Sequence, residues 1–383
     1  MFIYILIYIP FLLCAWFDFD GKTSPKQKNQ IMWIWVIVFT LFRGLRWDTG
    51  TDWDQFYYVF NHAEWSNFLN FYRDTTSDKT MDVGYMFFNA LFNEAALPYT
   101  FFLLVSNFWI MWCFKDFAQR HTAYPILTLI MLMNIGVPFP VRQSIALATS
   151  LWGYRFAVEK KWAIFFIVAI GAALIHKGSI VGLSLILFSL FADKWRIKWY
   201  WFAAAYLSTY VIAEVLGEYI RTLILIVGES NGQLDSYSAA YLNMDSTSVD
   251  FGNFNNSLLN GLSYIIFYAI LLYLREKNIE QCNKSVKGYE MFFLMYALSA
   301  VIDNLINQSD KNGMTEILGR VTSTIDMLPM LFPLIFTIFL PKFGIKKELL
   351  FGIFVIYMAY KYWQQIPGSF YHELFIPYKS IFD

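Results

Sequence analysis

The sequence predicts an all-α, polytopic integral membrane protein with about twelve transmembrane helices, in a range of about ten to thirteen. Its 383 residues are 57% hydrophobic and 20% aromatic, and only 15% are charged, whereas soluble domains carry about 25% charged residues. The apolar runs are continuous rather than alternating, which favours spanning helices over a barrel. The formal net charge is zero, and we expect no nucleic-acid partner.

Twelve apolar segments are candidate spans by their length and composition. They cover residues 1–17, 31–43, 99–115, 122–138, 143–159, 162–176, 177–192, 199–216, 258–274, 288–307, 321–340 and 349–364. The first segment lacks a basic n-region and a small-residue cleavage site, so we interpret it as a retained helix. Segment 82–97 is short and ends at Leu97-Pro98, which favours a re-entrant or interfacial helix.

The loops between these segments alternate in charge, and one set holds most of the lysines and arginines. The positive-inside rule makes that set cytoplasmic and leaves both termini outside. We expect one membrane domain, residues 1–383, with two longer outer-face segments at 44–98 and 217–257. The second is rich in Ser, Asn, Asp, Gly and Tyr, which is typical either of a solvated loop or of a lid that binds a polar ligand such as a sugar.

Polar residues that are unusual beside a membrane gather on the predicted outer side. They are Arg43, Arg46, Asp48, Asp52 and Asp54 after the second span, Arg142 at the start of the fifth, His176 and Lys177 at a turn, and Arg320 before the eleventh. A single such arginine could be a snorkelling anchor. Several arginines, interleaved with carboxylates and a histidine, indicate a site that holds anionic groups.

This combination of residue types fits transfer of a group from a lipid-linked pyrophosphate. Arginine is a planar, permanently charged fork suited to phosphate, and fixed cations stabilise the charge that grows on a leaving pyrophosphate. Aspartate or histidine can act as the general base for an attacking hydroxyl. Asp52 and Asp54 form an Asp-x-Asp pair, which alone is weak evidence for a metal, so we expect no metal and no other cofactor.

Four motifs, in order along the chain, resemble the EpsG-like family. The first is an arginine before a Gly-Thr-Asp-aromatic run, Arg43-Gly44-Leu45-Arg46-Trp47-Asp48-Thr49-Gly50-Thr51-Asp52-Trp53. The second is an Arg-Gln-x-x-Ala helix start, Arg142-Gln143-Ser144-Ile145-Ala146, and the third is similar to a Phe-His-x-Ser turn, Ile175-His176-Lys177-Gly178-Ser179. The fourth is a Pro-Tyr tail, Ile376-Pro377-Tyr378-Lys379-Ser380-Ile381-Phe382. The family often has Tyr three or four residues after its Asp, whereas here Phe56 precedes Tyr57.

EpsG-like proteins are grouped with the Wzy-type polymerases of O-antigen and capsule polysaccharides. The resemblance implies a GT-C-like, multi-span glycosyltransferase of the bacterial inner membrane whose active site faces the periplasm. It would join undecaprenyl-pyrophosphate-linked repeat units, one as donor and one as acceptor, within membrane lipid. A flippase and a chain-length regulator are the protein partners that the resemblance implies, in the biosynthesis of lipopolysaccharide or a similar glycan.

Each candidate residue then has a role. The candidate pyrophosphate ligands are Arg142, Arg320, Arg46, Arg43 and Lys177. Arg142 and Arg320 come first among them because each opens a span, and helix N-termini favour anions. Asp52 and His176 are alternative catalytic bases. The candidate sugar-binding residues are Asp48, Asp54 and Tyr57.

Two other classes of protein stay open. A flippase or transporter for lipid-linked sugars would also have many spans, with charges deep in them and internal repeats; Asp303 and Asp326 lie near or within apolar segments, but we find no repeat. A membrane acyltransferase that modifies surface glycans would need a membrane-embedded histidine, and the histidines here form no obvious constellation.

Overall fold

The computed structural model describes residues 2–49, 53–74, 77–135, 141–192, 194, 197–213, 254–309, 322–365, 376 and 378–382. Within these ranges the chain is predominantly helical, as the sequence predicts. Asp52, Arg320 and almost all of segment 217–257 lie outside the described residues, so the expectations for them stay predictions.

The described helices correspond closely to the predicted apolar segments. They are α1 (Phe2–Leu13), α2 (Trp16–Phe19), α3 (Pro25–Gly44), α4 (Trp53–His62), α5 (Val83–Glu94), α6 (Tyr99–His121), α7 (Pro125–Ile135), α8 (Val141–Val158), α9 (Trp162–Ile175), α10 (Leu185–Phe191), residues 199–213, α13 (Phe254–Ser285), α14 (Tyr289–Ser309), α16 (Leu328–Leu331) and α17 (Lys347–Gln365). Shorter pieces are the 3₁₀ segments η1 (Lys177–Ser184) and η4 (Leu340–Phe343) and the π-helical η3 (Ile335–Phe339).

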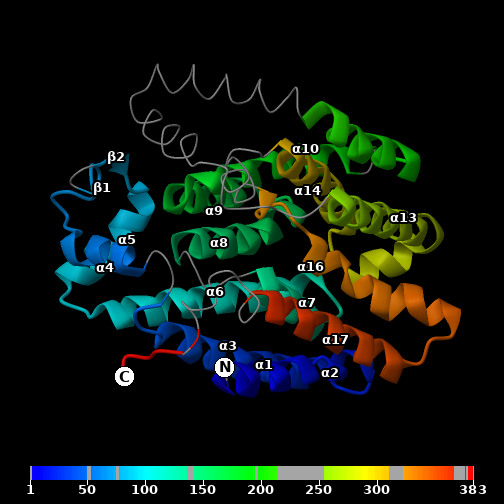
Figure 1. Cartoon of the computed structure of the whole chain (residues 1–383), viewed down its shortest axis with the longest axis horizontal. Helices are drawn as coiled ribbons and strands as arrows, with labels where there is room; N and C mark the ends of the chain where they lie inside the picture. The colour runs from blue at the N-terminus through cyan, green and yellow to red at the C-terminus, as the bar shows by residue number, and fades with distance from the viewer. Residues whose placement is uncertain are drawn as a thin grey trace.

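Four long helices pack side by side in the order α3, α6, α8 and α9 (Figure 1). Helices α6 and α8 run in the same direction, because Trp109 donates to Thr149 Oγ1 at 3.0 Å and, further along both helices, Asp116 pairs with Arg155 at 3.3 Å. The last turn of α3 meets the first turns of α6, where Gly44 leaves room for Leu104. Helices α4 and α5 and a small hairpin gather beyond this end of the bundle (Figure 1), which we call the hairpin end.

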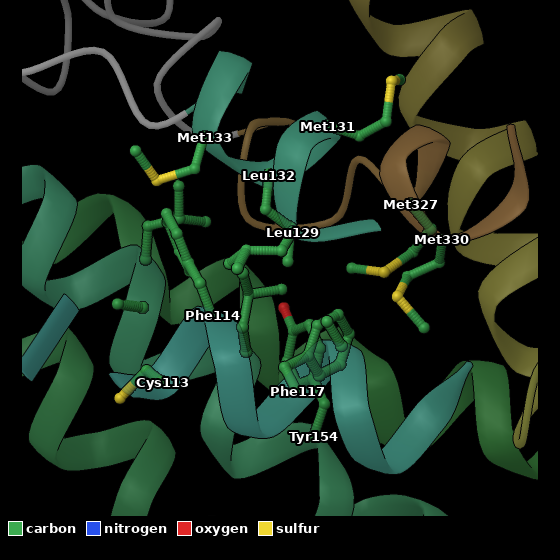
Figure 2. Close-up of a cluster of buried hydrophobic side chains, with 14 of the residues drawn as sticks. Cys113, Phe114, Phe117, Leu129, Met131, Leu132, Met133, Tyr154, Met327 and Met330 are labelled. Atoms are coloured by element: carbon green, nitrogen blue, oxygen red, sulfur yellow. The ribbon is translucent and has the colours of Figure 1, made fainter. Parts of the chain in front are cut away.

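The core of the bundle is built from aromatic and sulfur-containing side chains of several helices. Figure 2 shows Phe114 and Phe117 of α6 facing Leu129 of α7, with Met327 and Met330 entering from the segment around α16. All five are almost completely buried. Methionine is flexible enough to fill the irregular gaps between rings. Because these side chains come from α6 and α7 and from the segment around α16, the core joins the first half of the chain to the second.

At the opposite end of the bundle a buried carboxylate joins three helices. Asp18 Oδ1 lies 2.7 Å from Lys28 Nζ of α3, and Asp18 Oδ2 accepts the amides of Ile126 at 2.7 Å and Leu127 at 2.9 Å. These amides are among those that the first turn of α7 cannot satisfy internally. Asp18 therefore caps α7 and pairs with α3 at once.

Large apolar side chains also cover the outside of the helices. On α9, Ile164, Ile167, Ile170 and Leu174 are 44–71% exposed and follow one another at helical spacing. A soluble monomer seldom exposes such a continuous apolar stripe, and hydrocarbon chains of lipid would cover it without cost.

Two helical stretches among the described residues, Phe2–Phe19 and Tyr99–His121, are long and apolar enough to cross a membrane. Three shorter apolar stretches are Trp162–Ile175, Lys177–Phe191 and Leu328–Phe343. The count of about twelve spans, and the single membrane domain over 1–383, therefore stay predictions.

Segment 44–98 is more structured than a long loop. It contains α4, the strands β1 (Tyr72–Asp74) and β2 (Ser77–Thr80), which pair as an antiparallel hairpin, and α5. Helix α5 occupies the segment 82–97 for which a short helix was predicted. Helix α4 was not predicted, although its buried Trp53, Phe56 and Phe60 follow the spacing of one helical face.

Two predicted spans differ in helical form. The span 258–274 is part of the longer α13, which reaches Ser285 through a kink at Asn278 (φ −147°, ψ 40°). The span 321–340 is divided among α16, η3 and η4. Pro329 and Pro333 cause this irregularity, because proline has no amide to donate and clashes with the preceding turn.

Replacing Asp18 tests the contact at the opposite end. We expect Asp18→Ala to lower the free energy of unfolding by about 3–5 kcal/mol, because it leaves the Lys28 ammonium buried without its carboxylate and uncaps α7. Denaturation by SDS in mixed micelles would measure the loss. The exposed Lys22→Ala in the neighbouring loop should change it by less than about 0.5 kcal/mol; an equal effect of both variants would contradict this role of Asp18.

Candidate functional site

Two arginines at the end of α3 are buried at the hairpin end. Arg43 is 7% exposed and Arg46 is 2% exposed. The Arg43 guanidinium lies 5.9 Å from the Phe39 ring, and that of Arg46 lies 5.9 Å from the Tyr378 ring. Burial lowers the pKa of Arg46, while neighbouring tyrosines, Tyr4 foremost, oppose this shift. Arginine nevertheless stays charged, so two desolvated cations lie here.

The C-terminal tail packs against this pair of arginines. Tyr378 donates its hydroxyl to the Phe42 carbonyl at 2.7 Å, and the backbone of Ser380 forms an isolated antiparallel bridge with Arg46. The Phe42 and Tyr378 rings stack with centroids 5.0 Å apart. Two of the motifs that the sequence analysis singled out, the arginine segment and the Pro-Tyr tail, are therefore in contact although more than three hundred residues separate them.

The other two motifs meet at Asp82, on the residue before α5. Asp82 Oδ2 lies 2.9 Å from Arg142 Nη1, at the start of α8, and 3.7 Å from His176 Nδ1, just after α9. The Arg142 and Asp82 side chains are 10% and 8% exposed. The first contact is a buried, hydrogen-bonded ion pair; the second is too long for a hydrogen bond but places the carboxylate beside the imidazole ring.

More polar groups line the same site. Arg142 Nη1 also donates to Met81 Sδ at 3.4 Å. Ser179 is 1% exposed, its amide donates to the His176 carbonyl at 2.9 Å, and its hydroxyl has no hydrogen-bond partner among the described residues. Tyr85, fully buried one turn after Asp82, lies within electrostatic range of Arg142. We call Asp82, Arg142, His176 and Ser179 the Asp82 site.

A glycine allows α5 to come close enough to α9 for these contacts. A Cβ on Gly84 would lie 2.8 Å from the carbonyl carbon of Leu174 and 3.0 Å from the amide nitrogen of Ile175. The residue after Ile175 is His176, which leaves helical geometry at φ −152°, ψ 116° as α9 ends. Gly84 thus sets the distance between Asp82 and the histidine.

Aromatic rings fill the space between the two groups of cations. Trp47 and Trp53 lie 4.8 Å apart, Trp53 and Tyr99 lie 6.1 Å apart, and Tyr99 stacks on Phe102 at 5.9 Å. Phe102 in turn lies 6.0 Å from Tyr85. The arginines of α3 and the Asp82 site are therefore parts of one continuous aromatic and cationic layer at the hairpin end.

The remaining candidates lie at the rim of this layer or outside the described residues. Tyr57 stacks on Trp53 at 4.9 Å and is partly exposed, Asp54 and Lys177 are exposed, and Asp48 pairs with Lys379 of the tail at 3.0 Å. Within the part of the chain that the structure describes, no hydrogen bond or ion pair joins the side chains of these four residues to Arg142 or to the His176 ring. The roles proposed for Asp52 and Arg320 remain predictions.

Sequence reasoning missed Asp82. It is an ordinary aspartate between the hairpin and a short apolar segment, and it belongs to none of the four motifs. The available signal was its position directly before a helix, followed by Val83-Gly84-Tyr85 with a glycine that permits close packing. Its partners are 60 and 94 residues away, so only the fold shows the pairing.

These features define a class: a helical protein with long apolar helices and an Arg–Asp–His group, mostly shielded from solvent, at one end of the bundle. The chain belongs to the EpsG family, whose model matches residues 29–380. This membership, together with the apolar helices, indicates a membrane location and a role like that of a polysaccharide polymerase, a glycosyltransferase-like enzyme. No curated protein and no solved structure matches the chain.

The ion pair can be tested by a double-mutant cycle. Asp82→Asn and Arg142→Gln should each lower the free energy of unfolding by about 3–5 kcal/mol, because each leaves one buried charge without its partner. The double variant should lose about 0.5–3 kcal/mol less than the sum. Unfolding in SDS micelles measures all three, with the exposed Asp54→Asn as a control. Additive losses would contradict the pairing.

Gly84 offers a second test at the same contact. Gly84→Ala should lower the free energy of unfolding by about 1–3 kcal/mol, because α5 must move away from the end of α9. Gly171→Ala, in the interior of α9 with open space around it, should instead be neutral or raise it by up to about 1 kcal/mol. Thermal denaturation in detergent would compare the two. An unchanged Gly84→Ala protein would show that the close approach is not required.

Proposed function

We propose that this protein polymerises lipid-linked oligosaccharide repeat units at the outer face of the bacterial inner membrane. The donor glycan would be carried on undecaprenyl pyrophosphate, and the acceptor would be a second lipid-linked repeat unit. The observation that carries the proposal is the convergence of Arg142 and His176 on Asp82, at the same end of the bundle as Arg43 and Arg46.

In the proposed reaction a hydroxyl of the acceptor attacks the anomeric carbon of the donor. A new C–O bond forms, the bond from the anomeric carbon to the pyrophosphate oxygen breaks, and undecaprenyl pyrophosphate leaves with the bonding electrons. The hydroxyl proton moves to a base. His176 is the better placed candidate among the described residues, because Asp82 lies near enough to stabilise the imidazolium that forms. Asp52 remains the alternative base.

The Asp82 site would gain positive charge during this reaction, which favours the transition state. With neutral His176, the Asp82 carboxylate balances the Arg142 guanidinium. When His176 accepts the proton, the three side chains carry a net positive charge just as negative charge grows on the leaving pyrophosphate. In a dry site this charge stabilises the transition state more than the ground state. Arg142 would hold the phosphate, and Arg43 and Arg46 would add positive potential.

The other candidates take supporting roles in this proposal. Arg320 and Lys177 are further cations for the pyrophosphate, and Asp48, Asp54 and Tyr57 are candidate sugar contacts at the rim. A flippase would deliver the lipid-linked units, and a chain-length regulator would act on the growing chain. We propose no metal, since arginines and a histidine supply both the positive charge and the base.

Purified protein in nanodiscs, given lipid-pyrophosphate-linked repeat units alone, tests the proposal. We expect a ladder of products with release of the lipid pyrophosphate. His176→Gln should lower kcat by about 10²–10⁴-fold, and Arg142→Gln should lower kcat/KM by about 10²–10³-fold. The matched controls His62→Gln, on the exposed face of α4, and Arg120→Gln, paired with Asp116 near the opposite end, should stay near wild type.

Two results would contradict the proposal. Full activity of folded His176→Gln and Arg142→Gln proteins would remove the Asp82 site from the reaction. Movement of the lipid-linked units across the bilayer, or transfer of an acyl group, without any ladder would favour a flippase or an acyltransferase over a polymerase.

A further inference from the structure

A second group of polar side chains lies in the other half of the bundle, away from the Asp82 site. Asp303 and Tyr296 come from α14, Tyr264 from α13, Tyr206 from residues 199–213, and Asp326 from the turn before α16. We call these five residues the tyrosine–aspartate cluster. Asp303 lies within electrostatic range of Asp326, and both lie within that range of Tyr264.

The three tyrosine rings of the cluster, each from a different helix, form a row. The centroids of Tyr206 and Tyr264 are 5.8 Å apart with an angle of 25° between the rings, and those of Tyr264 and Tyr296 are 6.5 Å apart at 24°. Such offset, nearly parallel rings are favourable. They also bring tyrosine hydroxyls within electrostatic range of two carboxylates.

One buried hydroxyl in the cluster, that of Tyr296, can form a further hydrogen bond. Tyr296 is 1% exposed, and among the described residues its hydroxyl has no hydrogen-bond partner. It lies within electrostatic range of Tyr264, Asp326 and Tyr206, and its ring lies against that of Tyr264. A buried hydroxyl without a partner is costly and calls for an explanation; a bound group with hydroxyls of its own would satisfy it.

The cluster is not wholly buried. Tyr206 and Tyr296 are buried, whereas Tyr264, Asp303 and Asp326 are partly exposed. Both aspartates lie within predicted spans, where a carboxylate that faced lipid would be costly. We therefore expect the exposed part of these carboxylates to face a polar space rather than hydrocarbon.

Helix α8 links the cluster to the Asp82 site. Tyr154 of α8 donates its hydroxyl to the Thr324 carbonyl, two residues before Asp326. Arg142 opens the same helix, and Tyr154 follows it by about 18 Å along the axis at a rise of 1.5 Å per residue. A glycan of several sugar rings is long enough to reach from one site toward the other.

We propose that the tyrosine–aspartate cluster binds an uncharged sugar ring of the lipid-linked repeat unit. The partly exposed Tyr264 ring would contact the C–H groups of a sugar, the aspartates would accept hydrogen bonds from its hydroxyls, and a sugar hydroxyl could pair with Tyr296. Two carboxylates disfavour a uronic acid and the pyrophosphate alike. This inference rests on the proposed function, and it divides the substrate between an anion site at Arg142 and a sugar site at the cluster.

Saturation-transfer NMR on the full chain in nanodiscs tests the sugar site directly. The probes are methyl glycosides of glucose, galactose, mannose, N-acetylglucosamine, N-acetylgalactosamine and glucuronic acid. We expect saturation transfer to at least one uncharged glycoside and none to the glucuronide. Tyr264→Ala and Asp326→Asn should weaken that binding at least tenfold, whereas Tyr273→Ala, on an exposed face of the same helix, should not.

Polymerisation assays separate this inference from the proposed function. In Asp326→Asn and Tyr264→Ala proteins with wild-type thermal stability, we expect at least a tenfold rise in KM for the lipid-linked repeat unit. Binding of no glycoside by the wild type, or variants that match the wild type in both assays, would overturn the sugar site and leave the polymerase standing. Glycoside binding lost only in the cluster variants, in a protein that makes no polymer, would support the sugar site and overturn the polymerase.

Discussion

The ion pair between Asp82 and Arg142 is the contact on which the candidate site depends, because it joins the start of α5 to the start of α8 and places a carboxylate beside His176. An ion pair as buried as this one adds little net stability, but removing either partner is costly. The ion pair therefore serves chiefly to hold the side chains of the site in position. With Gly84 packed against the end of α9, it fixes a cation and a histidine from two helices around one carboxylate oxygen.

The sequence predicts the helices and several residues of this site, but it does not predict the central residue, Asp82. Continuous apolar runs predict the helices, and the motifs around Arg142 and His176 predict that both residues matter. The pairing of these motifs through Asp82 could not be predicted, because nothing local marks an aspartate whose partners are 60 and 94 residues away. Helix α4 could have been predicted from the spacing of Trp53, Phe56 and Phe60, which the length of the surrounding polar segment concealed.

The two polar groups of the bundle differ in charge, and this difference would give the proposed substrate a direction. Buried arginines at the hairpin end favour the phosphates of a lipid carrier, whereas Asp303 and Asp326 favour uncharged hydroxyls and repel anions. A pyrophosphate-linked glycan would therefore be held by its charged end near Arg142, with its sugars toward the tyrosines. The Tyr378 tail, packed on Arg46, closes the other side of the cationic layer.

The position of the phosphates is the most direct test of this account. A cryo-electron microscopy structure of the full chain with a non-hydrolysable undecaprenyl pyrophosphate analogue would locate them. The account predicts phosphate oxygens within hydrogen-bond distance, about 2.7–2.9 Å, of the Arg142 guanidinium, with His176 facing the anomeric position. Phosphates bound at the opposite end of the bundle, near Asp18 and Lys28, or beside the tyrosine–aspartate cluster would contradict it.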